Sequence, residues 1–165
     1  MTREQQNDYF LKWASEHNLL LRKVARSFAF GADQEDLYNE MLVAVWQAIP
    51  AWRGDAKPST FVYRVAHNYA LTWTRTRRNY SRAVERFGRE AASPTGSTYP
   101  DALLNQLYAA IRELPELDRS LVLLSFDGLP YKEIGEILGL SESNVGARLT
   151  RARARLTETL REQDQ

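Results

Sequence analysis

The side chains with the clearest chemical meaning lie in one C-terminal stretch, residues 131–156, which reads YKEIGEILGLSESNVGARLTRARARL. An Arg side chain can bind guanine through two hydrogen bonds or grip a phosphate, and an Asn side chain can pair with adenine. The expected second helix of this stretch exposes such side chains together with a hydroxyl: Ser143, Asn144, Arg148 and Arg151. They predict a surface that reads duplex DNA. The alternative is an ordinary helical hairpin whose Arg side is only solvated.

The same stretch carries the signals that position those side chains as a helix–turn–helix. Gly139 predicts a left-handed cap at the end of a short first helix, because no Cβ obstructs a positive φ. Ser141 can cap the second helix, and Gly135 is small enough to admit a close neighbour. The expected inner face of the second helix consists of Val145, Leu149, Ala152 and Leu156. A recognition helix of this kind fits the DNA major groove.

A second candidate surface combines cations with aromatic rings in the first half of the chain. Residues 75–90 hold six Arg against two Glu, a local charge of +4, and they follow Tyr63, Tyr69 and Trp73. Aromatic rings can stack on unpaired bases while Arg holds the backbone, so this pattern suits single-stranded DNA. The alternative is that the aromatic stripe is core packing.

An acidic segment lies upstream of this basic one. Residues 33–40 carry two Asp and two Glu, a local charge of −4. Acidic side chains in a first turn complement the positive end of a helix dipole. The other interpretation makes this face, with Leu37 and Met41 beside it, the docking site for a basic partner protein.

Composition excludes several classes of function. The chain has 165 residues, a net charge of +1 and no Cys, which removes disulfides, thiolate metal sites and cysteine nucleophiles. His17 and His67 are too few for a His-rich metal site. No apolar run approaches the roughly 20 residues of a membrane span, and the N-terminus has no signal-peptide character. We therefore expect a cytoplasmic protein with no metal, no cofactor and no membrane insertion.

The hydrophobic period is helical nearly everywhere, which predicts an all-α fold of two small helical domains. Between them AASPTGST, residues 91–98, has the composition of a flexible linker. We place the first domain at residues 1–82, the linker at 83–100 and the helix–turn–helix domain at 101–165.

Individual helices can be placed from stop signals and caps. They are expected over residues 7–28 and 33–49, and from a cap at Ser59 onward. The buried side of that third helix is expected to carry Phe61, Val62, Val65, Tyr69 and Trp73. In the second domain Asp101 is an expected cap, and Pro115 can begin a helix. The expected core there includes Leu103, Leu104, Leu107, Ile111, Leu114, Leu117, Leu121, Leu124 and Phe126.

The order of these parts resembles a bacterial sigma factor of the sigma-70 family, in its extracytoplasmic-function (ECF) group. The segments that carry the resemblance are DQEDLYNEMLVAVWQAI, AWRGDAKPSTFVYRVAHNYALTWTRTRR and LPELDRSLVLLSFDGLPYKEIGEILGLSESNVGARLTRARARL. They cover residues 19–80 and 101–160, in the order and with the gap of family regions two and four.

The resemblance implies a role for each surface. The candidates for binding core RNA polymerase are Asp33, Asp36, Leu37, Glu40 and Trp46. The candidates for binding the melted minus-ten strand are Arg53, Gly54, Asp55, Lys57, Phe61, Arg64, His67, Asn68 and Arg75. The candidates for reading the minus-thirty-five duplex are Ser143, Asn144, Arg148 and Arg151. Gly146 and Ala147 stand where many members carry a basic or hydroxyl pair, so fewer polar side chains reach the groove.

The resulting hypothesis is a promoter-specificity subunit that binds core RNA polymerase and promoter DNA, assists promoter melting and is controlled by an anti-sigma factor. A stand-alone repressor or activator would use the same C-terminal module, usually as a symmetric dimer. An adaptor whose N-terminal bundle only docks proteins is the third possibility. An enzyme is not expected, because no nucleophile–base pair, phosphate loop or metal spacing is present.

Overall fold

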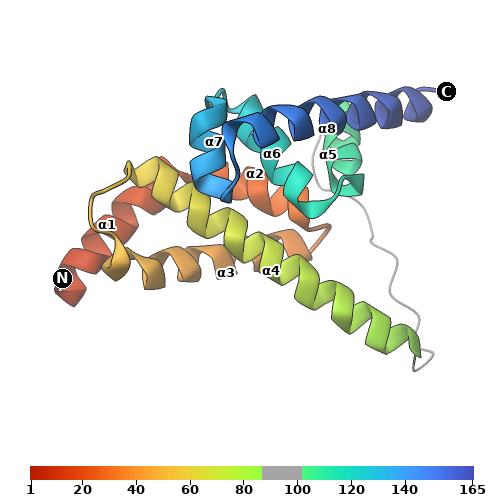
Figure 1. The fold of residues 1–165 in the computed structure, drawn as a ribbon. Coiled ribbons are helices and arrows are strands. Elements are labelled where there is room, and N and C mark those ends of the chain that lie inside the picture. The colour runs from red at the N-terminus through yellow and green to blue at the C-terminus, as the bar shows by residue number, and fades with distance from the viewer. Residues whose placement is uncertain (87–101) are drawn as a thin grey trace.

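The computed structural model describes residues 1–86 and 102–165, and their regular structure is entirely helical (Figure 1). The elements are α1 (Arg3–Glu16), α2 (Asn18–Phe28), α3 (Asp33–Ala48), the 3-10 turn η1 (Ile49–Ala51), α4 (Pro58–Arg86), α5 (Ala102–Glu113), α6 (Glu116–Phe126), α7 (Tyr131–Leu138) and α8 (Glu142–Gln163). The prediction of an all-α fold with two helical domains is confirmed. Most of the expected linker, and the expected cap Asp101, lie outside the described residues.

The first domain packs α2, α3 and α4 around a common core, with α1 across one end (Figure 1). The inner stripe of α4 consists of Val62, Ala66 and Ala70, all fully buried and spaced four residues apart. Small side chains at two of these positions allow α4 to lie close to its neighbours. Val62 is buried as expected. Phe61, Val65 and Tyr69 each precede a residue of this stripe by one position, which is about 100° around the helix axis, and they are only partly buried, as is Trp73.

Two expected helix boundaries differ in the structure. The expected helix 7–28 is interrupted at His17, whose φ of −110° and ψ of 16° end α1. The break lets α1 turn so that Trp13 is buried against Trp52, at a ring-centroid distance of 5.1 Å. The α4 helix begins at Pro58 rather than after a Ser59 cap. Pro is suited to a first helical position because its missing N–H would have no partner there.

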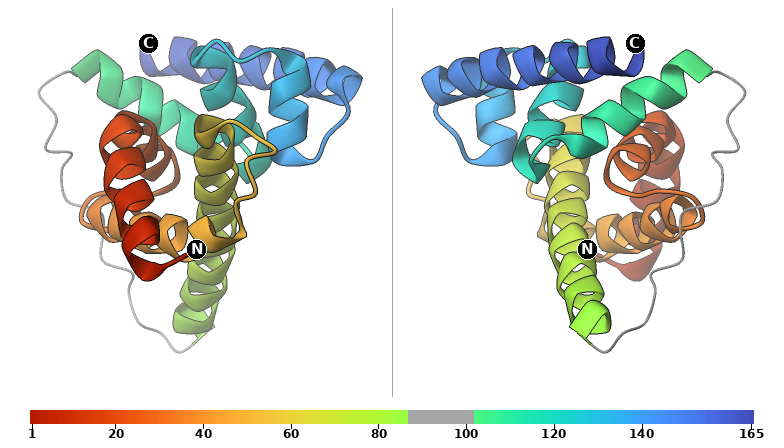
Figure 2. Two further views of the ribbon diagram at one scale, coloured as in Figure 1. Left: turned by 90° about the vertical axis from the view of Figure 1, so that its left-hand side faces the viewer. Right: turned by 90° about the vertical axis from the view of Figure 1, so that its right-hand side faces the viewer.

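The second domain packs α5, α6 and α7 around the long helix α8 (Figure 2). Its core includes Leu121, Leu124 and Ile111, as expected. Three residues expected in this core are exposed instead: Leu103 at 72%, Leu104 at 38% and Phe126 at 53%. Phe126 lies two residues after the buried Leu124, which places it on the opposite side of α6.

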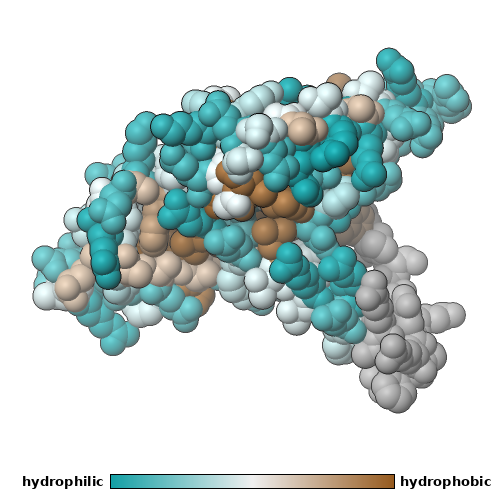
Figure 3. Space-filling view, viewed as in Figure 1, coloured by the Kyte–Doolittle hydropathy of each residue, from teal (hydrophilic) through white to brown (hydrophobic). Residues whose placement is uncertain are grey.

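The two domains pack directly against each other. The α2 helix lies against α5 and α6, and α4 lies against α6 and α7 (Figures 1 and 2). Stacked cations contribute to this contact: the Arg26 guanidinium lies 4.2 Å from the Tyr108 ring centre, and that of Arg119 lies 5.5 Å from the Phe28 ring. Hydrophobic residues gather at the middle of the face in Figure 3, with hydrophilic residues around them.

Candidate nucleic-acid and partner-docking surfaces

The helix–turn–helix forms as its sequence predicts. Gly139 ends α7 with a φ of 72°, and the Ser141 side chain caps α8 by accepting a hydrogen bond from the Asn144 N–H at 3.2 Å. A Cβ on Gly135 would overlap the carbonyl oxygen of Leu140, so only glycine fits there. The expected inner face of α8 is buried along its whole length: Val145, Leu149, Ala152 and Leu156.

The start of α8 presents three of the four expected duplex-reading residues to solvent: Ser143, Asn144 and Arg151. The fourth, Arg148, is half-buried, and its guanidinium forms an ion pair with Asp118 of α6 at 3.3 Å. A buried carboxylate needs a cation beside it, and Asp118 is nearly buried. The structure therefore holds Arg148 against the core of its own domain, which differs from the expected groove-facing position.

Gly146 faces α7 rather than open solvent. A Cβ at this position would lie 3.4 Å from the Tyr131 ring, which is ordinary contact. The small residue at 146 therefore leaves room for an aromatic side chain of the same domain, while Ala147 beside it is exposed.

The loop between η1 and α4 is shaped by Trp52. Its indole N–H donates to the carbonyl oxygen of Ala56 at 3.1 Å, and Gly54 takes a φ of 81° within the turn. The loop therefore presents a fixed set of exposed polar side chains: Arg53, Asp55 and Lys57. Phe61 differs from them, because its ring lies 5.8 Å from that of Trp13 and is partly buried.

The α4 helix continues this surface away from the loop. Arg64, Asn68 and Arg75 lie at positions i, i+4 and i+11, which share one side of a helix. Asn68 and Arg75 are exposed, and Arg64 is half-buried. Together with the loop they form what we call the strand face: Arg53, Asp55, Lys57, Arg64, Asn68 and Arg75.

The aromatic residues of α4 are engaged within the protein. The Tyr69 hydroxyl donates to Glu40 of α3 at 2.8 Å, and burial together with this bond raises the pKa of Tyr69. The Trp73 ring lies under the Arg77 guanidinium, which also pairs with Asp33 at 2.8 Å. These contacts hold α4 against α3, which agrees with the alternative interpretation that the aromatic residues serve in packing.

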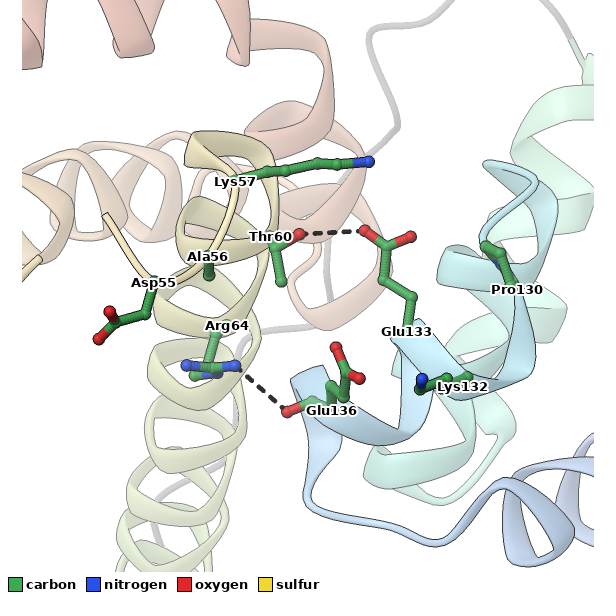
Figure 4. A pocket seen from close by; sticks show the side chains of 9 residues that line it. All are labelled: Asp55, Ala56, Lys57, Thr60, Arg64, Pro130, Lys132, Glu133 and Glu136. Atoms are coloured by element: carbon green, nitrogen blue, oxygen red, sulfur yellow. Dashed lines mark hydrogen bonds between the residues drawn. The ribbon is translucent and has the colours of Figure 1, made fainter. Parts of the chain in front are cut away.

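The first helix of the helix–turn–helix lies over one end of the strand face (Figure 4). The buried Thr60 hydroxyl donates to the Glu133 carboxylate at 3.0 Å, and the Arg64 guanidinium reaches the Glu136 carbonyl oxygen at 3.4 Å. Between the two domains is a pocket of about 680 Å³ with mixed charges on its walls. Its lining residues are Asp55, Ala56, Lys57, Thr60, Arg64, Pro130, Lys132, Glu133 and Glu136. Sequence reasoning missed Thr60, which only tertiary packing brings into this contact.

His67 was expected to face the melted minus-ten strand, but its side chain does not reach the surface. Its side chain is fully buried between the domains, with Nδ1 2.7 Å from the Ser120 hydroxyl oxygen of α6. In this arrangement the second domain covers this side of α4, so His67 can reach a DNA strand only when the domains part. The burial lowers the pKa of His67 to about 4.

Asp127, at the end of α6, joins the second domain to two helices of the first. Its carboxylate accepts hydrogen bonds from Lys23 of α2 and from the Tyr63 hydroxyl of α4, each at 2.8 Å. Burial, followed by this hydrogen bond, raises the pKa of Tyr63. One carboxylate therefore holds three helices together.

The acidic helix α3 presents only some of its predicted docking residues. Asp36 and Glu40 are exposed, whereas Leu37 is 0% exposed and belongs to the core. Asp33 is paired with Arg77, and the indole N–H of Trp46 donates to Asn7 of α1 at 2.9 Å. Leu37 thus cannot touch a partner directly, which corrects its expected role.

The exposed side of α3 includes residues that the sequence pattern did not single out. Asn39, Val43 and Gln47 continue the line of Asp36 and Glu40 along the helix. Val43 is 54% exposed, an apolar side chain amid polar ones. We call this set the α3 face: Asp36, Asn39, Glu40, Val43 and Gln47.

Metal-binding clusters and membrane spans were looked for in the described part of the chain. No group of three or more acidic or His side chains there could hold a metal ion. No helix within those residues is long and apolar enough to span a membrane.

Comparison with known proteins finds a family match for each of the two domains. Residues 13–80 match the family description "Sigma-70 region 2", and residues 104–156 match "Sigma-70, region 4". The chain is 29% identical over 133 residues to RNA polymerase sigma factor YlaC of Bacillus subtilis, covering 76% of each chain. It is 28% identical over 134 residues to the ECF RNA polymerase sigma-E factor of Escherichia coli K12, covering 73% of this chain and 70% of the relative.

Solved structures share the fold. The sigma factor RpoE of Bartonella quintana, crystallised with the anti-sigma factor NepR, has a TM-score of 0.71 at 22% identity, over 91% of this chain and 97% of that one. CnrH in complex with the cytosolic domain of CnrY has a TM-score of 0.64 at 21% identity, over 93% and 88%. With both family regions matched in order across the two domains, the chain belongs to the sigma-70 family, in its ECF group of transcription initiation factors.

Proposed function

We propose that this protein binds core RNA polymerase, directs it to specific promoters and assists promoter melting, without catalysing a reaction itself. The observation that supports this best is the presence of two surfaces suited to two forms of DNA on two domains of one chain. The strand face suits an unpaired strand, because exposed cations and an amide follow one side of α4. The start of α8 suits a major groove, because its polar side chains project from the first turns of a capped helix.

Each surface has a separate task in this proposal. The loop 52–57 and α4 bind the opened minus-ten strand, and α8 binds the minus-thirty-five duplex. Opening the duplex costs about 1.4 kcal/mol of stacking per base-pair step. Capture of unpaired bases at the strand face, together with polymerase contacts, offsets that cost.

The α3 face is the proposed contact with core polymerase. Asp36 and Glu40 supply charge for a basic partner surface, and Val43, one turn after Glu40, supplies an apolar contact. Charge complementarity speeds association and fixes orientation, while a buried apolar side chain contributes affinity.

A regulator is part of the proposal. The two solved proteins named above are each bound to another protein, and one of them is a sigma factor bound to an anti-sigma factor. We expect an anti-sigma factor to cover surfaces of this chain in the same manner, and the protein to act in the cytoplasm.

Run-off transcription tests the proposal. The purified chain is mixed with core polymerase and a library of promoter fragments, and transcripts are sequenced. Discrete start sites that require the added chain support the proposed function. Absence of any specific transcript, combined with tight binding of a discrete operator by the chain alone, would instead indicate a stand-alone regulator.

A further inference from the structure

His67 lies where three helices from both domains meet. The ring comes from α4 and is 0% exposed. Its Nδ1 is 2.7 Å from the Ser120 hydroxyl of α6, and its centroid is 6.3 Å from the Phe28 ring of α2. The Tyr63 ring stacks on its other side at 6.2 Å, with 16° between the ring planes. The second nitrogen, Nε2, is buried without a hydrogen-bond partner among the described residues.

This site accommodates a neutral imidazole and disfavours a protonated one. We assign the proton to Nδ1, which then donates to the Ser120 hydroxyl oxygen. In this tautomer Nε2 carries only a lone pair, so no N–H donor is left without an acceptor. A proton on Nε2 would place a charged donor in a closed site with no acceptor, which is costly. The burial that lowers the pKa of His67 to about 4 has the same cause.

The charged groups near the ring do not overcome this preference. Asp127 of α6 is the anion that favours protonation of His67, but its carboxylate already accepts from Lys23 of α2 and Tyr63 of α4. Arg119 of α6 lies over the Phe28 ring that packs on His67. The anion that favours protonation is thus already engaged by a cation and a hydroxyl group.

We propose that protonation of His67 switches the contact between the two domains: the closed chain holds the ring neutral, and a proton on the ring drives the domains apart. In the open chain the ring faces water and recovers the pKa of an exposed His. Because the closed form is the one that excludes the proton, closure is favoured above the open-form pKa and weakens as the pH falls below it.

The size of the effect follows from the two pKa values. With 6.5 for the exposed ring and about 4 for the buried one, the ratio of closed to open molecules falls about tenfold between pH 7.5 and pH 5.5. The functional consequence, which rests on the proposed function, is that opening removes α7 from Thr60 and Arg64 and frees the strand face. The switch itself concerns the free chain, so it can fail while run-off transcription succeeds, and the reverse.

The absence of Cys from the sequence permits a direct test with two labels. Ser15→Cys on α1 and Glu158→Cys on α8 change exposed residues of different domains, and a donor and an acceptor dye are attached there. Single-molecule energy transfer is then recorded from pH 7.5 to 5.5, with circular dichroism confirming that the helices persist. We expect the ratio of the high-transfer to the low-transfer population to fall about tenfold over this pH range.

Two matched variants assign the titrating group. His67→Gln removes the proton site and should make the population ratio independent of pH over this range. His17→Gln removes the other His and should leave the wild-type response unchanged. A wild-type ratio that does not change with pH, or an undiminished response in His67→Gln, would overturn the switch.

A second measurement needs no substitution at the interface. NMR of the two His side chains in the full-length wild-type chain gives the protonation of His67 directly, so this measurement does not depend on whether His67→Gln folds. The proposal expects His67 to titrate below 6.5, together with the loss of energy transfer. Titration of His67 near 6.5 with the domains still closed would rule the proposal out.

Discussion

Leu140 donates its backbone N–H to the carbonyl oxygen of Gly135 at 2.9 Å, and its own carbonyl oxygen occupies the space that a side chain on Gly135 would need. The turn of the helix–turn–helix therefore closes backbone against backbone. The direction in which α8 leaves the turn depends on this contact.

Replacing Gly135 with Ala should destabilise the second domain by about 1–3 kcal/mol, because the added methyl forces the turn apart. Urea unfolding followed by circular dichroism measures the loss. Gly146→Ala is the matched control. Its Cβ would lie 3.4 Å from the Tyr131 ring, and Ala favours a helix by up to about 1 kcal/mol, so this substitution should not lower the stability. Equal unfolding midpoints for Gly135→Ala and the wild type would contradict the close contact.

Neighbouring residues on α3 should separate stability from docking. Leu37→Ala removes a fully buried side chain and should cost about 2–5 kcal/mol of folding free energy. Asp36→Arg changes an exposed residue, so the fold should persist while affinity for core polymerase falls by roughly tenfold or more through like-charge repulsion. Thermal unfolding and co-elution with core polymerase measure the two effects.

The control for Asp36→Arg is Glu158→Arg, the same kind of charge reversal at an exposed site on α8. It should leave polymerase binding intact. Wild-type binding by Asp36→Arg would remove the α3 face from the proposed docking site.

Arg151 and Arg148 should behave differently on the upstream element. Arg151 is exposed, so Arg151→Ala should weaken holoenzyme use of that element by about 1–3 kcal/mol without lowering stability. Arg148→Ala removes the ion-pair partner of Asp118 and should lower stability as well. Footprinting of the holoenzyme and urea unfolding of the free chain distinguish them, and an unchanged footprint for Arg151→Ala would exclude base reading by that residue.

The carboxylate that joins the domains can be tested through Asp127→Asn. Hydrogen bonds to a charged group contribute about 1.5–3 kcal/mol each, although solvent screens the partly exposed Lys23. We expect the ratio of closed to open molecules at pH 7.5 to fall by roughly tenfold in the two-label experiment. Asp164→Asn, at an exposed site after α8, should leave the population as in the wild type.

Sequence reasoning worked best where the determinants are local. The caps at Gly139 and Ser141 and the inner face of α8 depend on residues a few positions apart, and the structure agrees with all of them. Local spacing also placed α3 to within one residue: the expected helix 33–49 is α3 from Asp33 to Ala48, followed by the turn that contains Pro50.

The contact between the two domains could not be predicted from local sequence patterns. His67 and Ser120 are 53 positions apart, and no local pattern says that the second domain covers this side of α4. Leu37 shows the related difficulty on α3: spacing placed it beside the acidic residues, but only the packed structure shows that it faces the core.

In the closed chain the Arg64 guanidinium reaches the Glu136 carbonyl oxygen, and α7 lies over this end of the strand face. The apparent dissociation constant of the free chain for single-stranded DNA is therefore its intrinsic value divided by the fraction of molecules that are open. If about one molecule in a hundred is open, binding is about a hundredfold weaker than the contacts alone allow. Truncation, a bound protein or a change of buffer can alter that measured constant without changing a single contact to the nucleic acid.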